Sequence, residues 1–187
     1  MLCGFAAVDI RIKINILWII MENKLLPNCI LQKSIISEGG AIAWNKNSVI
    51  EAIEEIVKLN YAILGGDVWA LRINNIPNSK DSINYEDIYV GIIPFKNGSD
   101  TVCNWHSSKN KNEKWSKFVL RSKKETLKFI FNEPTIENLV EEKIKDKIYY
   151  NLVYSSEYKY NLIKKLSVTN NTNEIREIWK ELNKDEV

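Results

Sequence analysis

The spacing of apolar residues along the chain changes from a helical pattern to a strand pattern and back. From position 48 to 60, apolar side chains recur at the spacing of one helix face. Asn45 or Ser48 can cap this helix, and Ser48 with Glu51 fits a capping box, in which the two residues satisfy each other's end amides. We therefore predict a helix that buries one stripe, formed by Val49, Ile53, Ile56, Val57 and Asn60.

Residues 61–73 predict two short strands separated by a glycine pair. Residues 61–64 are apolar, Gly65 and Gly66 follow, and residues 68–73 alternate so that Trp69 shares a face with the residues two and four positions on. Glycine lets the backbone take a positive φ or approach another chain closely. We therefore expect the pair to form a junction between the strands.

A hairpin and a second helix follow. Residues 88–93 and 101–105 read as strands, joined by an Asn97-Gly98 turn, which is a strong hairpin signal. Residues 113–131 carry apolar side chains at helical spacing, and the proline at position 134 ends this second helix.

The region after residue 133 is predicted to be helical. Residues 136–148 fit an amphipathic helix, a tyrosine-rich segment follows, and Thr172 can cap a last short helix. The expected fold class is α+β, with a small antiparallel sheet, two main helices packed on it and a helical C-terminal appendage. The expected parts are an N-terminal extension (1–21), an α+β domain (22–133) and a helical C-terminal region (134–187).

The N-terminal extension allows two interpretations. Residues 10–16 alternate with period two, as an edge strand does, or the extension precedes a natural start at Met21. Its charged residues exclude a membrane span, and it lacks the parts of a signal peptide. We therefore expect no membrane segment and a cytoplasmic location.

Composition excludes several classes of function. A net charge of +2 on balanced acids and bases argues against a nucleic-acid partner, which calls for a clustered basic face. The cysteines, Cys3, Cys29 and Cys103, are odd in number and widely spaced, so a disulfide framework is not expected. His106 is the only histidine, and with Cys103 it gives too few ligands for a zinc site. We expect no metal and no cofactor.

Gly65-Gly66-Asp67 invites comparison with the Gly-Gly-Asp/Glu-Glu-Phe hairpin of diguanylate cyclases. Val68 stands where those enzymes have a second acid, and the strand that supplies their other metal ligand is absent. Neither a Walker loop nor a dinucleotide fingerprint is present. Asp67 is therefore expected to bond nearby backbone amides and fix a turn or bulge, or else to contact a partner.

The tryptophans also have two interpretations. Trp69, Trp105 and Trp115 fit the core of a small sheet domain, and tryptophan is also enriched in binding hot spots. A tryptophan on a sheet face that no helix covers would be exposed. The sequence alone does not say which face that is.

Several motifs together resemble one family, the bacterial Immunity protein 40 family of polymorphic toxin systems. The resemblance covers roughly residues 22–131, and the chain departs from the family at its N-terminal extension, around residues 76–86 and in the C-terminal region. The motifs are Leu25-Leu26-Pro27, Ala43-Trp44, Ala62-Ile63-Leu64-Gly65-Gly66-Asp67-Val68, Asn104-Trp105 and Glu113-x-Trp115-x-x-Phe118-Val119-x-Arg121-Ser122.

The resemblance implies a non-enzymatic inhibitor that binds a cognate protein toxin and occludes its active site. If the toxin is a nuclease with a basic cleft, the acids at 81, 86 and 87 would complement it and speed association. The residues expected to contact the partner are Asp67, Trp69, Asp81, Glu86, Asp87 and Trp105. The residues expected to be structural are Gly65, Gly66, Trp44, Trp115 and Arg121.

Two other functions stay open from the sequence. One is a small cytosolic enzyme that uses Asp67 in a pocket beside Trp69, and the other is a regulatory protein-interaction module. The sequence does not decide between a monomer and a homodimer.

Overall fold

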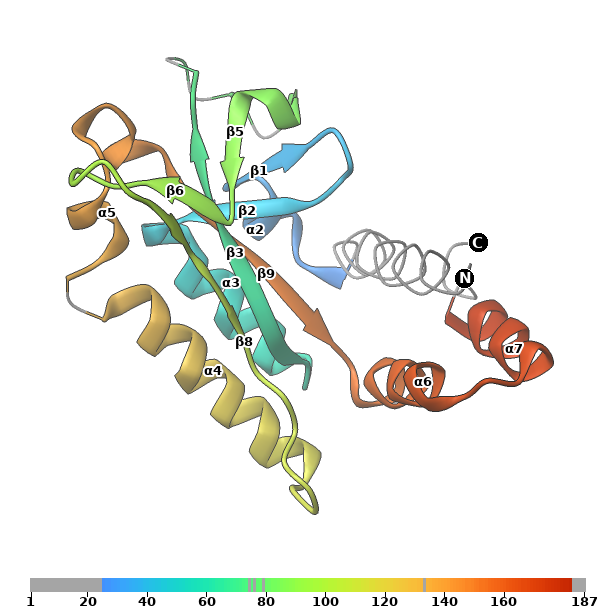
Figure 1. The fold of residues 1–187 in the computed structure, drawn as a ribbon. Coiled ribbons are helices and arrows are strands. Elements are labelled where there is room, and N and C mark those ends of the chain that lie inside the picture. Colours follow the sequence, from blue (N-terminus) through green and yellow to red (C-terminus); the bar gives the residue numbers. More distant parts are fainter. Residues whose placement is uncertain (1–24, 74, 76, 79, 133, 183–187) are drawn as a thin grey trace.

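The computed structural model describes residues 25–182 except 74, 76, 79 and 133, and it is built on a seven-stranded sheet (Figure 1). The strand predicted over residues 10–16 lies outside the described residues. The strands of the sheet are β1 (Ser34–Ser37), β2 (Ile42–Asn45), β3 (Ala62–Leu71), β4 (Ser82–Ile83), β5 (Ile88–Val90), β8 (Asn104–His106) and β9 (Ile148–Ser155). A two-stranded hairpin consists of β6 (Ile92–Pro94) and β7 (Asp100–Val102). The helices are α2 (Asn28–Leu31), α3 (Lys46–Lys58), α4 (Trp115–Phe131), α5 (Ile136–Leu139), α6 (Glu157–Val168) and α7 (Thr172–Leu182), with 3-10 segments η2 (Tyr85–Asp87) and η3 (Glu142–Lys147).

Strand β3 organises the sheet. The strand order is β4-β1-β2-β9-β3-β5, and β8 also pairs with β3. One edge of β3 pairs with β9 from Ala62 to Ala70, and the other edge pairs first with β8 and then with β5. These pairs are antiparallel, whereas β1 and β4 are parallel. The α+β class predicted from the sequence is confirmed, with a mixed sheet in place of a wholly antiparallel one.

Helix α3 begins directly after Asn45. The side-chain oxygen of Asn45 accepts hydrogen bonds from the backbone N–H groups of Asn47 and Ser48, at 3.1 and 3.0 Å. These bonds satisfy two amides that have no partner inside the helix. Asn45 is therefore the cap, and the alternative in which Ser48 caps the helix is wrong, because Ser48 already lies in the first turn.

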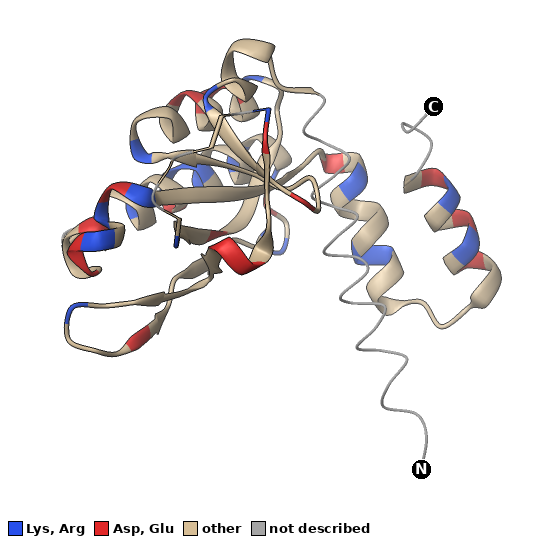
Figure 2. Cartoon of the chain, turned by 90° about the horizontal axis from the view of Figure 1, so that it is seen from above, with Lys and Arg blue, Asp and Glu red and all other residues tan. Residues whose placement is uncertain are grey.

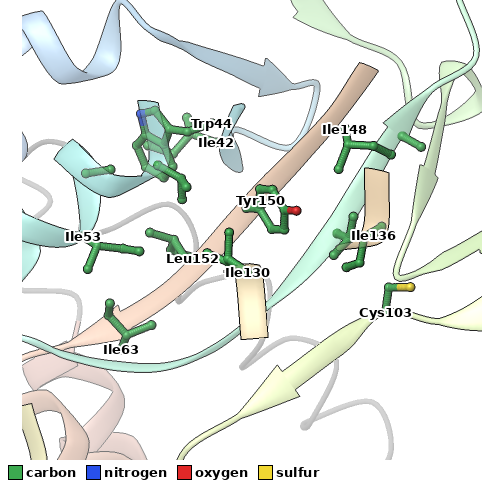
Figure 3. Packing of buried hydrophobic residues seen from close by; sticks show 14 of the residues in the cluster. Ile42, Trp44, Ile53, Ile63, Cys103, Ile130, Ile136, Ile148, Tyr150 and Leu152 are labelled. Atoms are coloured by element: carbon green, nitrogen blue, oxygen red, sulfur yellow. The ribbon is translucent and has the colours of Figure 1, made fainter. Parts of the chain in front are cut away.

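The main core lies between the sheet and the helices α3 and α4. Figure 3 shows Tyr150 of β9 in the middle of this core, among side chains such as Trp44, Ile53 and Ile130. The buried Tyr150 hydroxyl donates to Glu137 Oε1 at 2.7 Å. Burial and this hydrogen bond raise the pKa of Tyr150. Strand β9 is thereby fixed both by apolar packing and by a polar link to α5.

A second, smaller core lies on the opposite face of the sheet. Trp69 and Leu71 of β3 pack there with Tyr149 of β9. Ile83 of β4 and Ile88 of β5 join them, so the connection through η2 closes this end of the face. The rest of the face is not part of this cluster, and it carries the candidate site described below.

Strand β9 differs from the sequence prediction. It lies inside region 134–187, which was predicted to be helical, yet it forms the strand between β2 and β3. Its burial pattern is nearly continuous because it is a central strand covered on both faces. Such an apolar run cannot be told from a buried helix by periodicity. The helix predicted over 136–148 is the short α5 followed by η3, and Ile148 already begins β9.

Helices α6 and α7 follow β9 and lie beyond its end, away from the centre of the sheet (Figure 1). They share a small apolar cluster that includes Leu166 and Ile178. Tyr160 of α6 packs against the rings of Trp115 and Phe118 in α4, with centroid distances of 5.4 and 5.8 Å. This aromatic contact joins the helical pair to the rest of the protein.

Candidate functional site

The glycine pair lies within one continuous strand, where β8 and β9 approach β3 from its two edges. A Cβ on Gly66 would overlap the carbonyl oxygen of Asn151 and come within 2.5 Å of Trp105 Cη2. A Cβ on Gly65 would overlap the carbonyl oxygen of Trp105, and Gly65 also has a φ of +152°. Both positions therefore require glycine. The predicted break between two strands is corrected to a bulge between Ile63 and Gly65.

Helix α4 supplies the hydrogen-bond partner of a backbone amide next to this bulge. The backbone N–H of Ile63 donates to Ser122 Oγ at 3.0 Å, and the Ser122 hydroxyl donates to the Val119 carbonyl at 3.0 Å. The Trp115 indole N–H donates to the Asn60 carbonyl at 2.8 Å. The motif from Trp115 to Ser122 therefore holds α4 against the start of β3.

Arg121 holds the loop before α4. Its guanidinium donates to both carboxylate oxygens of Glu113 at 2.9 and 2.8 Å, to Glu125 Oε1 at 2.7 Å and to the Ser108 carbonyl at 2.7 Å. The hydrogen bonds from Arg121 and from the Asn110 amide lower the pKa of Glu113 to about 2. Arg121 thus links the loop before α4 to the helix, through hydrogen bonds from its guanidinium to Glu113, Glu125 and Ser108.

Trp69 and Trp105, the two tryptophans expected to contact a partner, differ in how far they are buried. Trp69 is only 2 % exposed, so it offers no surface to a partner and no accessible wall for a pocket beside Asp67. Trp105 is half-buried, stacks on Phe129 at 4.5 Å and donates its indole N–H to Thr126 Oγ1 at 3.2 Å. Trp105 therefore mainly joins β8 to α4, and its remaining surface lines a cavity between them.

Asp67 lies on the face of β3 that is turned away from α3 and α4. Its neighbour Val68 belongs to the main core, and successive side chains of a strand point to opposite faces. The carboxylate is half-buried, and its Oδ1 lies 3.3 Å from where a Cβ of Gly91 would be. Burial raises the pKa of Asp67, and no described residue hydrogen-bonds the carboxylate. The expectation that Asp67 bonds backbone amides is therefore not met among the described residues.

Three apolar side chains are exposed beside Asp67, and the sequence analysis did not single them out. Val90, Ile92 and Val102 are 40 %, 54 % and 64 % exposed. Ile92 and Val102 are directly opposite each other in the hairpin. Gly91 has a φ of +67° and divides the predicted strand 88–93 into β5 and β6. Val90 and Ile92 lie on its two sides. Gly91 was the signal in the sequence that could have indicated this break.

Acidic residues lie near these apolar side chains, and Asp100 lines one hollow with Val90, Ile92 and Arg72. Glu86 and Asp87 lie in η2, directly before β5, and Asp100 lies on β7 two residues before Val102. Figure 2 shows how acidic and basic residues are distributed over the chain. Asp81 lies in the loop before β4 and accepts a hydrogen bond from Asn78. We use the name acidic sheet face for the set made of Asp67, Glu86, Asp87, Val90, Ile92, Asp100 and Val102.

The acidic sheet face combines exposed apolar area with carboxylates, which suits contact with a basic protein surface. No described residue forms an ion pair with Glu86, Asp87 or Asp100. Within the described part of the chain, no group of three or more His, Cys, Asp or Glu residues could hold a metal ion. None of the described helices has the length and apolar character to cross a bilayer.

Comparison with known proteins gives a match to a family model. The model described as Immunity protein 40 matches residues 34–154, which is more than half of the chain. The matched region begins at β1 and ends at the next-to-last residue of β9. The searches of curated proteins and of solved structures gave no match.

Proposed function

Because the chain belongs to the Immunity protein 40 family, we propose that it binds a cognate protein toxin in the bacterial cytoplasm and keeps the toxin inactive. The family match carries this proposal. It spans the sheet, both main helices and the β6–β7 hairpin, and therefore the whole acidic sheet face. Helices α6 and α7 lie outside the matched region.

We infer that inhibition works by occlusion of the toxin's active site. A stable protein complex typically buries about 800 Å² on each partner, enough to cover a substrate cleft. The exposed side chains of Val90, Ile92 and Val102 provide the apolar centre of such a contact. No chemical step by this chain is required.

Asp67 is the proposed anchor of the contact. Its half-buried carboxylate has lost part of its hydration, and no described residue replaces the lost hydrogen bonds. A lysine or arginine of the toxin would supply a charge-assisted hydrogen bond there. Because the Asp67 carboxylate would gain this hydrogen bond only in the complex, the bond would lower the free energy of the complex and not that of the free protein.

The charges around Asp67 favour a toxin with a basic surface. From position 77 to 104 the chain carries the acids Asp81, Glu86, Asp87 and Asp100 against the lysines Lys80 and Lys96. Arg72, which stacks on Tyr89, adds one basic group to the hollow that Asp100 lines. Lys96 is itself paired with Glu142 at 2.7 Å. A nuclease cleft, which is basic because it binds phosphates, is the natural complement.

Co-expression tests the proposed function. The toxin domain encoded beside this chain is expressed in a heterologous bacterium with and without the protein, and growth is measured. We expect growth only when the protein is present. A failure to restore growth, with both proteins detected, would reject the immunity role in favour of an interaction module without a toxin.

Charge reversal tests the steering. A variant in which Asp81, Glu86 and Asp87 are replaced by lysine is compared with the unchanged protein at low and at physiological salt. We expect the association rate at low salt to fall by about tenfold or more, because steering by opposite charges acts on the on-rate. Equal association rates at low salt would show that these acids do not steer the toxin.

A further inference from the structure

Strand β7 of the hairpin continues through Cys103 into β8 of the seven-stranded sheet, so the two strands form one continuous edge. The N–H of Cys103 donates to the Gly91 carbonyl at 2.7 Å, and its carbonyl accepts from the N–H of Val68 at 2.9 Å. Backbone groups of successive residues in an extended strand point to opposite sides. The N–H and C=O groups of Val102 and Asn104 therefore point away from the sheet.

The same reasoning extends to the end of β8. Ser107 donates its N–H to the Leu64 carbonyl at 2.7 Å, and Trp105 is opposite Gly66 in the register with β3. The backbone groups of His106, which lies between Trp105 and Ser107, point outward. Within the described part of the chain, β7 pairs only with β6, and β8 pairs only with β3.

This edge lacks two of the features that often prevent strands from adding to it, although β7 and β8 are short, at three residues each, and β7 carries Asp100. Natural edge strands are often protected by lysine, by proline or by a covering segment. Residues 100–106 contain neither lysine nor proline, whereas Pro94 and Lys96 stand on the other arm of the hairpin and at its turn. The side chains of Val102, Asn104 and His106 are all exposed.

A cavity of about 450 Å³ lies beside the edge, between β8 and α4. Trp105 and Phe129 form its aromatic wall, and His106, Glu125 and Lys128 line its rim. A strand edge next to a groove can hold an extended chain, because the edge binds its backbone and the groove takes alternate side chains.

We propose that the edge from Val102 to His106 is a docking site for an extended segment of the toxin, which adds to the sheet as a further strand. The inference rests on the proposed function and names how the partner is held. The added strand would pair with the outward backbone groups, and its side chains would reach the cavity on one face and Asp67 on the other.

The charges beside the edge favour a segment of the toxin, and not a second copy of this chain, as the strand that pairs with it. The sheet face next to the edge carries Asp67 and Asp100, so it calls for a strand with lysine or arginine. Residues 100–106 contain an aspartate and neither lysine nor arginine. A second copy paired edge to edge would therefore not supply these basic groups.

A pair of variants at one position separates backbone pairing from side-chain contact. Asn104→Pro removes an outward N–H, and Asn104→Ala changes the side chain but keeps that N–H. Proline is tolerated in edge strands where the N–H faces solvent, and thermal melts report whether both variants fold. With the neighbouring toxin domain as probe, we expect Asn104→Ala to bind within about threefold of the unchanged protein and Asn104→Pro to bind about tenfold or more weakly. Equal affinity of two folded variants would overturn the proposal.

Hydrogen exchange of the unchanged protein gives a second test that does not depend on a variant. We expect the amides of Val102, Asn104 and His106 to exchange at least about tenfold more slowly in the complex than in the free protein. Unchanged exchange at these amides would overturn the proposal. So would a dimer of the free protein in which the same amides are already protected, because a second copy would then occupy the edge. An absence of any binding by the unchanged protein would instead reject the proposed function itself.

Discussion

The indole ring of Trp105 occupies the space that a side chain at Gly66 would need. A Cβ on Gly66 would come within 2.5 Å of Trp105 Cη2, on a ring that already stacks against Phe129 at 4.5 Å. The glycine therefore lets β8 and α4 approach β3 closely. The glycine pair serves to place the strand that borders the acidic sheet face, and no catalytic role is needed to explain it.

Replacing Gly66 by alanine should destabilise the protein. The new methyl group would overlap Trp105 and the carbonyl of Asn151, and overpacking of this kind costs about 1–3 kcal/mol. Urea unfolding measures the loss. Gly98→Asn is the control, since a Cβ there meets nothing within 4 Å and asparagine tolerates the positive φ of this turn. Equal stability of Gly66→Ala and the unchanged protein would contradict the close approach.

Ser122→Ala should be costly because it leaves the Ile63 N–H buried without a partner. An unsatisfied buried donor costs about 1–3 kcal/mol. Ser167→Ala is a matched control, because Ser167 also donates to the carbonyl three residues earlier but lies exposed on α6. Thermal melts should show a clear loss only for Ser122→Ala, and similar losses for both would argue against the role of the bulge amide.

Trp44 and Trp69, both buried, predict losses of different size when the indole N–H is removed. Trp44 donates to the Ile30 carbonyl at 3.0 Å, whereas the Trp69 N–H is buried without an acceptor among the described residues. Both changes to phenylalanine remove volume, but only Trp44→Phe also removes a hydrogen bond. We expect Trp44→Phe to cost about 1–3 kcal/mol more than Trp69→Phe in unfolding experiments. A larger loss for Trp69→Phe would contradict this difference.

The elements with local signals were predictable from the sequence. Helix α3, the Asn97-Gly98 turn and α4 each have their own periodicity or turn chemistry. Strand β9 does not, because its residues are buried on both faces and so lack alternation. Its place between β2 and β3 depends on pairing with residues that lie far away in the sequence, such as Ala62 with Ser155 and Ala43 with Asn151, which no local pattern encodes.

The candidate site was predictable only in part. The acids near β4 and β5 stand out in the sequence, but Val90 and Ile92 do not, because they belong to the apolar run 88–93 that was predicted as one strand. Gly91 has a positive φ and ends β5 there, and a sequence shows the glycine without showing its φ. Trp69 and Trp105 could not be told apart in the sequence. Trp69 is buried and Trp105 is half-buried, and this difference depends on what covers each ring in the fold.

The Glu113–Arg121 pair predicts a specific dependence of stability on pH. The hydrogen bond from Arg121 lowers the pKa of Glu113 from 4.5 to about 2 in the folded protein. A lowered folded pKa gives stability that is fully present above the unfolded value and is lost as pH falls toward about 2. Glu113→Gln should therefore be less stable than the unchanged protein above pH 4.5, and the difference should shrink toward pH 2. Chemical unfolding across this range checks it, and a difference that does not vary with pH would contradict the assignment.

Asp67 predicts the reverse dependence. Burial raises its folded pKa above the ordinary 3.8, so the charged form is less favourable in the folded protein than in the unfolded one. The contribution of Asp67 to the stability of the folded protein is therefore most favourable below the ordinary pKa, and it is lost as the pH rises through the folded pKa. Asp67→Asn removes the charge, so at neutral pH this variant should be more stable than the unchanged protein.

The most direct test of the account measures stability and toxin affinity together for Asp67→Asn. Calorimetric titration with the neighbouring toxin domain gives the affinity, and a thermal melt gives the stability. We predict that the variant melts at a higher temperature yet binds about tenfold or more weakly, because it loses the charge that would pair with a basic group of the toxin. Equal affinity of the variant and the unchanged protein, or no binding by the unchanged protein, would contradict the account.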